Sequence, residues 1–187
     1  MKVGALLLTP GAGSDSNHAA LRAIESAVAP MPVARVDFPY RKEGRRAPDR
    51  APKLIACVRE EAAVLVANTR IRPGALALGG RSMGGRMCSL AVAEGLAARA
   101  LVLISYPLHP PGKHDNLRVD HFPDLEVPCL FVSGTKDPFG SPEELEHHTK
   151  LLPGPVTHVW IEGGGHDFKR HDDFVAATVR DWLATLR

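Results

Sequence analysis

The pentapeptide GRSMG at residues 80–84 constrains the fold more than any other segment of this sequence. An apolar run precedes it at residues 75–78, and a helix-like stretch follows it at residues 87–93. A serine at a sharp turn from a strand into a helix needs glycine two residues before it and two after it, because side chains there would crowd the backbone. The segment therefore predicts a strand, a tight turn carrying Ser82, and a helix. The pentapeptide by itself also fits an ordinary loop or a helix cap.

Apolar runs of strand length alternate with helix-like segments along the whole sequence. We expect strands at residues 3–9, 33–38, 75–80, 100–106, 128–133 and 156–161, and helices at residues 17–29, 50–68, 84–97, 142–151 and 171–186. This alternation is typical of a mainly parallel α/β sheet of about six strands with helices on both faces. No repeat or linker divides residues 1–187, so we expect one domain.

An acid and a base follow Ser82 along the chain, each just after an expected strand. Asp137 lies in the turn after residues 128–133, and His166 follows residues 156–161. The carboxyl ends of parallel strands meet at one edge of a sheet, so we expect the three side chains to converge as a catalytic triad. Taken singly, Asp137 could cap a turn and His166 could be a solvated loop histidine. The order Ser82, Asp137, His166 favours the triad.

A nucleophilic serine also needs donors for the oxyanion of its tetrahedral intermediate. Residues 9–13, Thr-Pro-Gly-Ala-Gly, follow the first expected strand. We expect the backbone N–H groups of Ala12 and Met83 to form an oxyanion hole. The alternative, a phosphate-binding loop at residues 11–13, is disfavoured because no Gly-Lys-Ser/Thr follows.

Composition excludes several classes of protein. Hydrophobic residues make up 44% of the chain, charged residues make up 24%, and the net charge is only +2. These values are ordinary for a soluble globular protein. The apolar stretches are too short to cross a bilayer, and residues 1–3 run into the first expected strand without a signal peptide. We therefore expect a cytoplasmic protein with a small-molecule substrate and no membrane or nucleic-acid partner.

Cysteine and histidine provide no obvious metal site. Cys57, Cys88 and Cys129 have no C-x-x-C spacing and are expected to be buried, reduced thiols. Three of the nine histidines, His109, His114 and His121, lie in a proline-rich loop without the spacing of metal ligands. We therefore expect neither a metal nor an organic cofactor.

Basic residues follow several of the expected strands. Their positions at one edge of the sheet predict a basic rim, which either attracts anionic substrates or is simply a solvated loop. The residues of this rim are Arg41, Lys42, Arg45, Arg46, Arg50, Arg81, Lys136, Lys169 and Arg170. Within it Arg45, Arg46 and Arg81 are candidate substrate contacts, as is Tyr106 at the end of the expected strand 100–106.

With these residues placed, the chain resembles the small, lidless α/β-hydrolases of the dienelactone-hydrolase-like group. More closely, it resembles the branch that contains the testis-expressed hydrolase-like proteins and the hydrolase-like domain of a chromatin-complex subunit. The resemblance rests on residues 79–84, 104–109, 130–137 and 160–162, together with His166. It implies a minimal α/β-hydrolase fold without a lid domain.

The chain departs from that group in two places. Pro10-Gly11 stands where relatives have His-Gly in the oxyanion turn, so the backbone donor is expected to remain without the histidine. Dienelactone hydrolase itself resembles this architecture, but its nucleophile is a cysteine, and this chain has Ser82 at that position. The difference argues against the lactone substrate of that enzyme.

These observations predict a serine hydrolase that cleaves small esters or thioesters through an acyl-enzyme. Residues 107–127 are too few for a lid of several helices, so we expect an open site that favours short acyl groups. One alternative is a catalytically weak or inactive hydrolase-like protein-interaction module. Another is an acyl transferase or peptidase that uses the same triad.

Overall fold

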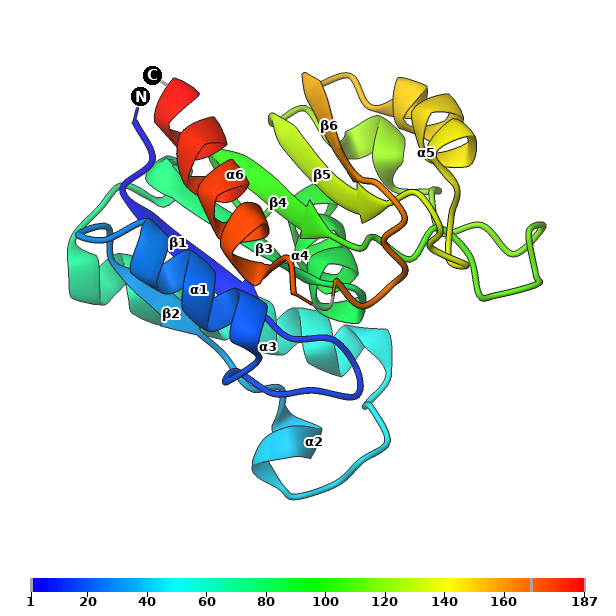
Figure 1. Cartoon of the computed structure of the whole chain (residues 1–187). Helices are drawn as coiled ribbons and strands as arrows, with labels where there is room; N and C mark the ends of the chain where they lie inside the picture. Colours follow the sequence, from blue (N-terminus) through cyan, green and yellow to red (C-terminus); the bar gives the residue numbers. More distant parts are fainter. Residues whose placement is uncertain (1, 169, 187) are drawn as a thin grey trace.

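Six strands form one sheet in which every described pair is parallel. The computed structural model describes residues 2–168 and 170–186. The sheet order is β2-β1-β3-β4-β5-β6, so β3 lies between β1 and β4 (Figure 1). The strands are β1 (Ala5–Thr9), β2 (Val33–Arg35), β3 (Leu76–Arg81), β4 (Ala100–Ile104), β5 (Cys129–Gly134) and β6 (Val156–Ile161).

Helices cover both faces of this sheet. One face carries α1 (Ala19–Ala27) and α6 (Asp172–Thr185), which lie side by side in Figure 1. The opposite face carries α3 (Ala51–Thr69) and α4 (Met83–Ala93). The remaining helices, α2 (Pro39–Lys42) and α5 (Pro142–His148), are short, and 3₁₀ turns occur at Pro73–Ala75, Phe122–Asp124 and Thr149–Leu151.

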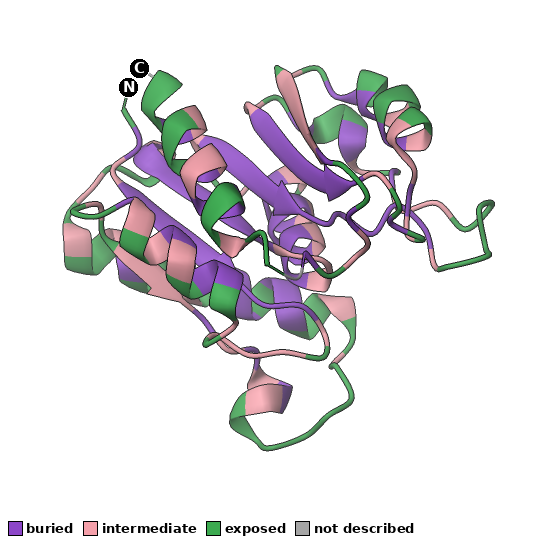
Figure 2. Ribbon diagram, in the orientation of Figure 1, coloured by how far each residue is buried: buried purple, intermediate pink, exposed green. Residues whose placement is uncertain are grey.

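Alternate residues of the central strands point into two separate cores. In β4, Leu101 and Leu103 belong to the core under α3 and α4, whereas Val102 and Ile104 belong to the core under α1 and α6. Every residue of β4 is buried, as the purple strands of Figure 2 show. A strand buried on both faces must be apolar at every position, which explains the continuous apolar runs of the sequence.

The expected elements are largely confirmed, with two local differences. The strand expected at residues 33–38 ends at Arg35, and the short helix α2 follows at Pro39, where the sequence predicted no helix. Four residues give no apolar period, so only the proline at its first turn could have signalled α2. The helix expected at residues 142–151 is α5 followed by a 3₁₀ turn.

The segment between β4 and β5 contains only the 3₁₀ turn Phe122–Asp124 in the described part of the chain. No helical lid domain is therefore inserted there, as expected. None of the described helices is long and apolar enough to cross a membrane. The three cysteines are free and buried, and burial raises the pKa of Cys88 and of Cys129 to about 12.

Candidate active site

Ser82 occupies the turn between β3 and α4 with an unusual backbone conformation. Its φ of 52° and ψ of −120° lie in a sparsely populated region that costs about 1–3 kcal/mol. The turn fits only because glycine flanks it. A Cβ atom on Gly84 would lie 2.5 Å from the carbonyl oxygen of Pro10, and one on Gly80 would collide with Thr9. The sequence pattern is thus explained by the close approach of β1 and the residues that follow it.

Ser82, His166 and Asp137 form a continuous chain of contacts. His166 Nε2 lies 2.8 Å from Ser82 Oγ, and His166 Nδ1 lies 2.8 Å and 3.0 Å from the two carboxylate oxygens of Asp137. An ionised carboxylate only accepts hydrogen bonds, so Nδ1 carries the proton and Nε2 is left to accept from the serine hydroxyl. The Asp137 side chain is 2% exposed and that of His166 is 19% exposed. This arrangement can remove a proton from Ser82.

Three further residues hold His166 in place. Arg81 Nη2 and Ser105 Oγ both donate to the backbone carbonyl of His166, at 2.9 Å and 3.0 Å. The ring of Phe139 lies over the imidazole of His166, with 4.0 Å between the ring centroids. The backbone N–H of Phe139 donates to Asp137 Oδ1. The position of Ser105 directly after β4 is a signal that could have identified it. No sequence pattern could have identified Phe139 as a contact of His166.

The turn at residues 10–13 lies against the elbow. A Cβ atom on Gly11 would come within 3.6 Å of Ser82 Cβ. Tyr40, from α2, donates its hydroxyl to the carbonyl of Ala12 at 2.9 Å and so fixes this turn. Met83 is the first residue of α4, where a backbone N–H has no partner within its own helix. Both expected oxyanion donors, Ala12 and Met83, therefore belong to segments that border Ser82.

A family model described as an alpha/beta hydrolase domain matches residues 2–182, which is nearly the whole chain. The chain belongs to the α/β-hydrolase family.

Solved structures with this α/β-hydrolase fold span most of the chain at low sequence identity. A dienelactone hydrolase from Anabaena variabilis has a TM-score of 0.81 and 20% identity over 100% of this chain and 88% of its own. The esterase domain of a Rhodothermus marinus protein has a TM-score of 0.74 and 16% identity over 99% of this chain and 88% of its own. The type II thioesterase BorB of the borrelidin biosynthetic cluster has a TM-score of 0.69 and 19% identity over 95% of this chain and 91% of its own. At these identities the likeness concerns the fold alone.

Two candidate substrate contacts of the α/β-hydrolase are engaged within the protein. Besides its bond to His166, Arg81 pairs with Asp167 at 3.4 Å, and its side chain is 13% exposed. Tyr106 is fully buried in the core under α3 and α4, where its hydroxyl donates to the carbonyl of Arg118 at 2.7 Å. The structure therefore brings Arg81 to the triad as a support for His166, and it does not bring Tyr106 to the site.

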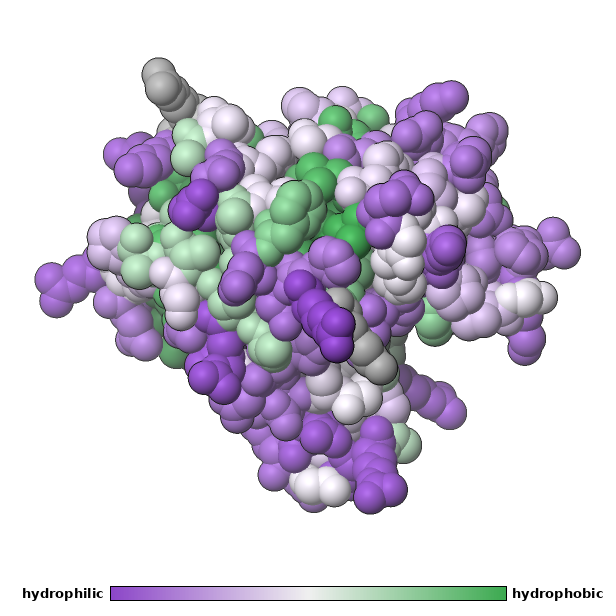
Figure 3. All heavy atoms as spheres, in the orientation of Figure 1, coloured by the Kyte–Doolittle hydropathy of each residue, from purple (hydrophilic) through white to green (hydrophobic). Residues whose placement is uncertain are grey.

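The other basic residues lie mostly in α2 and the loop after it, a region that is hydrophilic in Figure 3. Arg45 is exposed and bonded to Glu43 and Asp49, at 2.6 Å and 2.9 Å. Arg46 is also exposed. Arg41 and Lys42 contact Asp15 and Glu61. Lys136 and Arg170 are exposed, and Lys169 lies outside the described residues. Acidic partners thus neutralise much of the expected basic rim.

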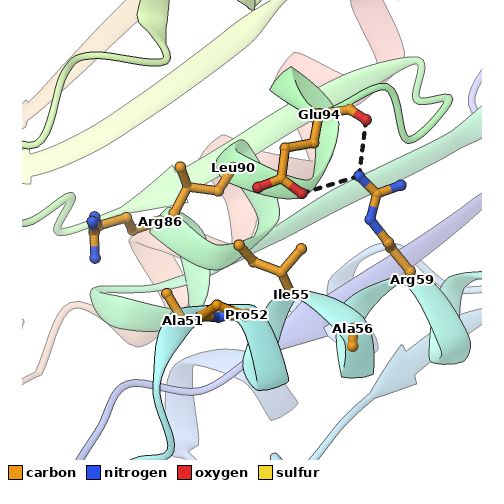
Figure 4. Close-up of a pocket in the computed structure, with 8 residues that line it drawn as sticks. All are labelled: Ala51, Pro52, Ile55, Ala56, Arg59, Arg86, Leu90 and Glu94. Carbon is orange, nitrogen blue, oxygen red and sulfur yellow. Dashed lines mark hydrogen bonds and ion pairs between the residues drawn. The ribbon is translucent and has the colours of Figure 1, made fainter.

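A hollow of about 440 Å³ opens between α3 and α4 (Figure 4). It is lined by Ala51, Pro52, Ile55, Ala56, Arg59, Arg86, Leu90 and Glu94. Arg86 lies one helical turn after Ser82, and its buried Nε has no hydrogen-bond partner. At the far end Arg59 is tied to Glu94, as the dashed lines show. No sequence pattern predicted this hollow, because it forms only where α3 and α4, which are separated by β3 in the chain, pack side by side.

His18, the N-cap of α1, lies in the electrostatic field of the site. Burial and the positive charge of Arg81 lower the pKa of its imidazole, against the opposing effect of Asp172 and Asp167. The lowered pKa favours the neutral imidazole of His18. Its Nδ1 accepts a hydrogen bond from the N–H of Ala20 at 3.3 Å, so its role in the structure is to cap α1.

Proposed function

We propose that this α/β-hydrolase is a serine hydrolase that cleaves small esters or thioesters. Ser82 is the nucleophile, His166 the general base and Asp137 the group that orients and stabilises His166. The observation that carries the proposal is the contact of both His166 ring nitrogens, one with Ser82 Oγ at 2.8 Å and the other with Asp137 at 2.8 Å.

In the proposed mechanism, Ser82 Oγ attacks the carbonyl carbon while its proton passes to His166 Nε2. The N–H groups of Ala12 and Met83 stabilise the oxyanion. His166 then gives the proton to the leaving alcohol or thiol as the acyl-enzyme forms. Water repeats the sequence on the acyl-enzyme: His166 takes its proton, the hydroxide adds to the carbonyl, and Ser82 leaves with that proton. Asp137 stabilises the imidazolium at each step.

The proposed substrate class is supported by the lack of a helical lid in the described segment between β4 and β5 and by the names of the structural neighbours. The neighbours include a dienelactone hydrolase, an esterase domain and a type II thioesterase. We propose that residues 1–187 act as one domain. The motifs around Ser82 and Asp137 also support the branch of the testis-expressed hydrolase-like proteins.

A fluorophosphonate probe tests the nucleophile directly. We expect it to label Ser82, and we expect the Ser82→Ala variant to lose the label and about 10³-fold or more of the esterase rate, since the oxyanion donors alone leave a residual rate. Asp137→Asn should fold but lose a comparable factor, because an amide can hold the wrong tautomer of His166. Ser26→Ala, at an exposed position on α1, is the control.

The alternatives give different results in the same experiment. Absence of labelling at Ser82 in folded protein would favour the protein-interaction module. Labelling at Ser82 with faster acyl transfer to an added amine or thiol than to water would favour a transferase, and cleavage of amide substrates would favour a peptidase. Unchanged esterase activity in Ser82→Ala would exclude the triad altogether.

We expect a preference for acyl chains of about four carbons or fewer, because no lid supplies apolar surface for longer chains. Rates for a series of esters with increasing acyl length measure this preference. A rate that rises steadily with acyl length would instead identify an apolar pocket, for which the hollow between α3 and α4 is the candidate. The Leu90→Gln variant would then lower the rate for the long esters selectively.

A further inference from the structure

Two histidines and a glutamate meet beside the loop that carries Asp137, where the N–H of His109 donates to the carbonyl of Phe139. His109 and His114 belong to the loop after β4, and Glu144 belongs to α5. His109 is buried, His114 is exposed, and Glu144 is intermediate. Each residue places one ligand-type atom within 4.8 Å of those of the other two. The spacing of the histidines along the chain did not reveal this group, because the carboxylate comes from a distant helix.

The hydrogen bonds of His109 leave its second nitrogen facing a negative charge. His109 Nδ1 lies 2.9 Å from the carbonyl oxygen of Pro110, which can only accept, so Nδ1 carries a proton. Nε2 lies 3.4 Å from Glu144 Oε1. Nε2 also lies 3.5 Å from Glu144 Oε2, so it faces the whole carboxylate, and either a proton or a metal ion between the two groups balances the negative charge. A histidine held by a backbone carbonyl in this way is typical of metal ligands.

The carboxylate of Glu144 is held with one oxygen toward the two histidines. Its Oε2 accepts the backbone N–H of Ser141 at 2.8 Å in the capping box of α5. This hydrogen bond fixes the orientation of the carboxylate. Its Oε1 is directed to the two histidines, 2.9 Å from His114 Nδ1. The helix cap therefore presents one oxygen of a fixed carboxylate to the group.

We propose that His109 Nε2, His114 Nδ1 and Glu144 Oε1 bind a divalent transition metal ion, with Zn²⁺ as the best fit. Two histidine nitrogens and one carboxylate oxygen are a common zinc set, completed by water as a fourth ligand. Metal–ligand distances of about 2.0–2.1 Å place neighbouring tetrahedral ligands about 3.3 Å apart. Glu144 Oε1 lies 3.4 Å from His109 Nε2 and 2.9 Å from His114 Nδ1, and these two separations bracket that value. All three ligand atoms lie within 4.8 Å of one another. On binding, the His114 nitrogen exchanges its hydrogen bond to Glu144 for a bond to the metal.

The position of this metal site gives it a structural role. The N–H of His109 donates to the carbonyl of Phe139 at 3.1 Å, and Phe139 in turn contacts both Asp137 and His166. Figure 1 shows the loop after β4 extending beyond the sheet. A metal ion here would tie that loop to α5 and would hold the loop that carries Asp137.

Zn²⁺ titration of the full chain, first stripped with a chelator, tests the site. Calorimetry should give one Zn²⁺ per chain, and at Zn²⁺ about 100-fold above its Kd the Tm should rise by roughly 5–10 °C. His114→Ala and Glu144→Gln should each weaken binding by at least about 10-fold. His114 is exposed, so its removal should leave the fold intact, and glutamine at position 144 can still accept from Ser141. His147→Ala, an exposed histidine of α5 outside the group, is the matched control.

Co²⁺ in place of Zn²⁺ gives a spectroscopic readout that does not depend on activity. The visible bands of four-coordinate Co²⁺ should appear in the wild-type chain and in His147→Ala, and they should be absent in His114→Ala. Thiolate charge-transfer bands would instead place the metal at a cysteine and overturn the proposal. So would a Zn²⁺ affinity in His114→Ala equal to that of the wild type. The group would then be only a hydrogen-bonded pair of histidines on a helix cap.

Discussion

The carbonyl oxygen of His166 is as firmly held as its ring. Arg81 and Ser105 both donate to it, from the ends of neighbouring strands β3 and β4. Ser105 has a φ of 48°, which is uncommon for a residue other than glycine. These contacts fix the position of the His166 imidazole relative to Ser82. A displacement of a catalytic group by about 1 Å can lower the rate by about 10²-fold.

We predict that Arg81→Met lowers kcat by about 10-fold or more with little change in KM. The variant removes the hydrogen bond from the charged Arg81 to the His166 carbonyl, worth about 1.5–3 kcal/mol, together with the ion pair to Asp167. The Arg81 side chain is largely buried, so we expect little effect on substrate binding. Steady-state kinetics with a short ester separates the two parameters. Arg180→Gln on α6, which is exposed, controls for the lost charge. A rise in KM at constant kcat would show that Arg81 binds substrate, as the sequence suggested.

Single residues could be predicted from the sequence only where the sheet itself assembles them. Ser82, Asp137 and His166 each follow a strand, and a parallel sheet gathers these positions at one edge. Phe139 and Glu144 reach their partners through loop conformation and a helix cap, which no periodic pattern encodes. Tyr106 shows the reverse case: it follows a strand, yet its ring turns into the core and contacts Phe122 and Phe131.

At the scale of elements, the site depends on two turns that pack backbone against backbone. The turn after β1 and the elbow after β3 come from adjacent parallel strands, and no side chain separates them at Gly84. The strands were predictable because they are buried on both faces and therefore apolar throughout. The helix α2 was not predictable in the same way, although its Tyr40 holds the turn at Ala12.

We predict that Gly84→Ala destabilises the protein by about 1–3 kcal/mol and reduces esterase activity, because its Cβ would displace the turn after β1. Gly13→Ala is the matched control for stability. A Cβ atom at Gly13 meets nothing within 4 Å, so that variant should unfold at the wild-type temperature or slightly above it. Thermal unfolding of both variants measures the difference. Equal Tm values would show that the two turns have room to separate.

The whole molecule contains several histidines whose burial opposes protonation. Burial is the main cause that lowers the pKa of His18 and of His158, and burial together with the positive charge of Arg86 lowers that of His121 to about 4. His121 Nε2 lies 2.8 Å from Ser89 Oγ of α4. Each of these side chains fits the fold as a neutral imidazole, and no single element accounts for all three.

We predict that the protein loses stability as the pH falls from about 6.5 toward 4. In this range the unfolded chain binds a proton at position 121 that the folded chain does not, so the free energy of unfolding falls with pH. At pH 5 the loss from His121 amounts to roughly 2 kcal/mol. His121→Gln can keep a hydrogen bond to Ser89 without titrating, so its free energy of unfolding should fall less between pH 8 and pH 5.

Urea unfolding at several pH values, with a chelator present so that bound metal does not contribute, measures this difference. The wild type and His121→Gln share every other titrating side chain, so the comparison isolates position 121 together with its coupling to Asp120 and Asp124. His147→Gln, an exposed position on α5, should follow the wild-type curve. If His121→Gln loses as much stability as the wild type between pH 8 and pH 5, then the loop after β4 opens before the histidine is protonated. The acid sensitivity of the molecule would then come from opening of that loop and not from protonation of His121.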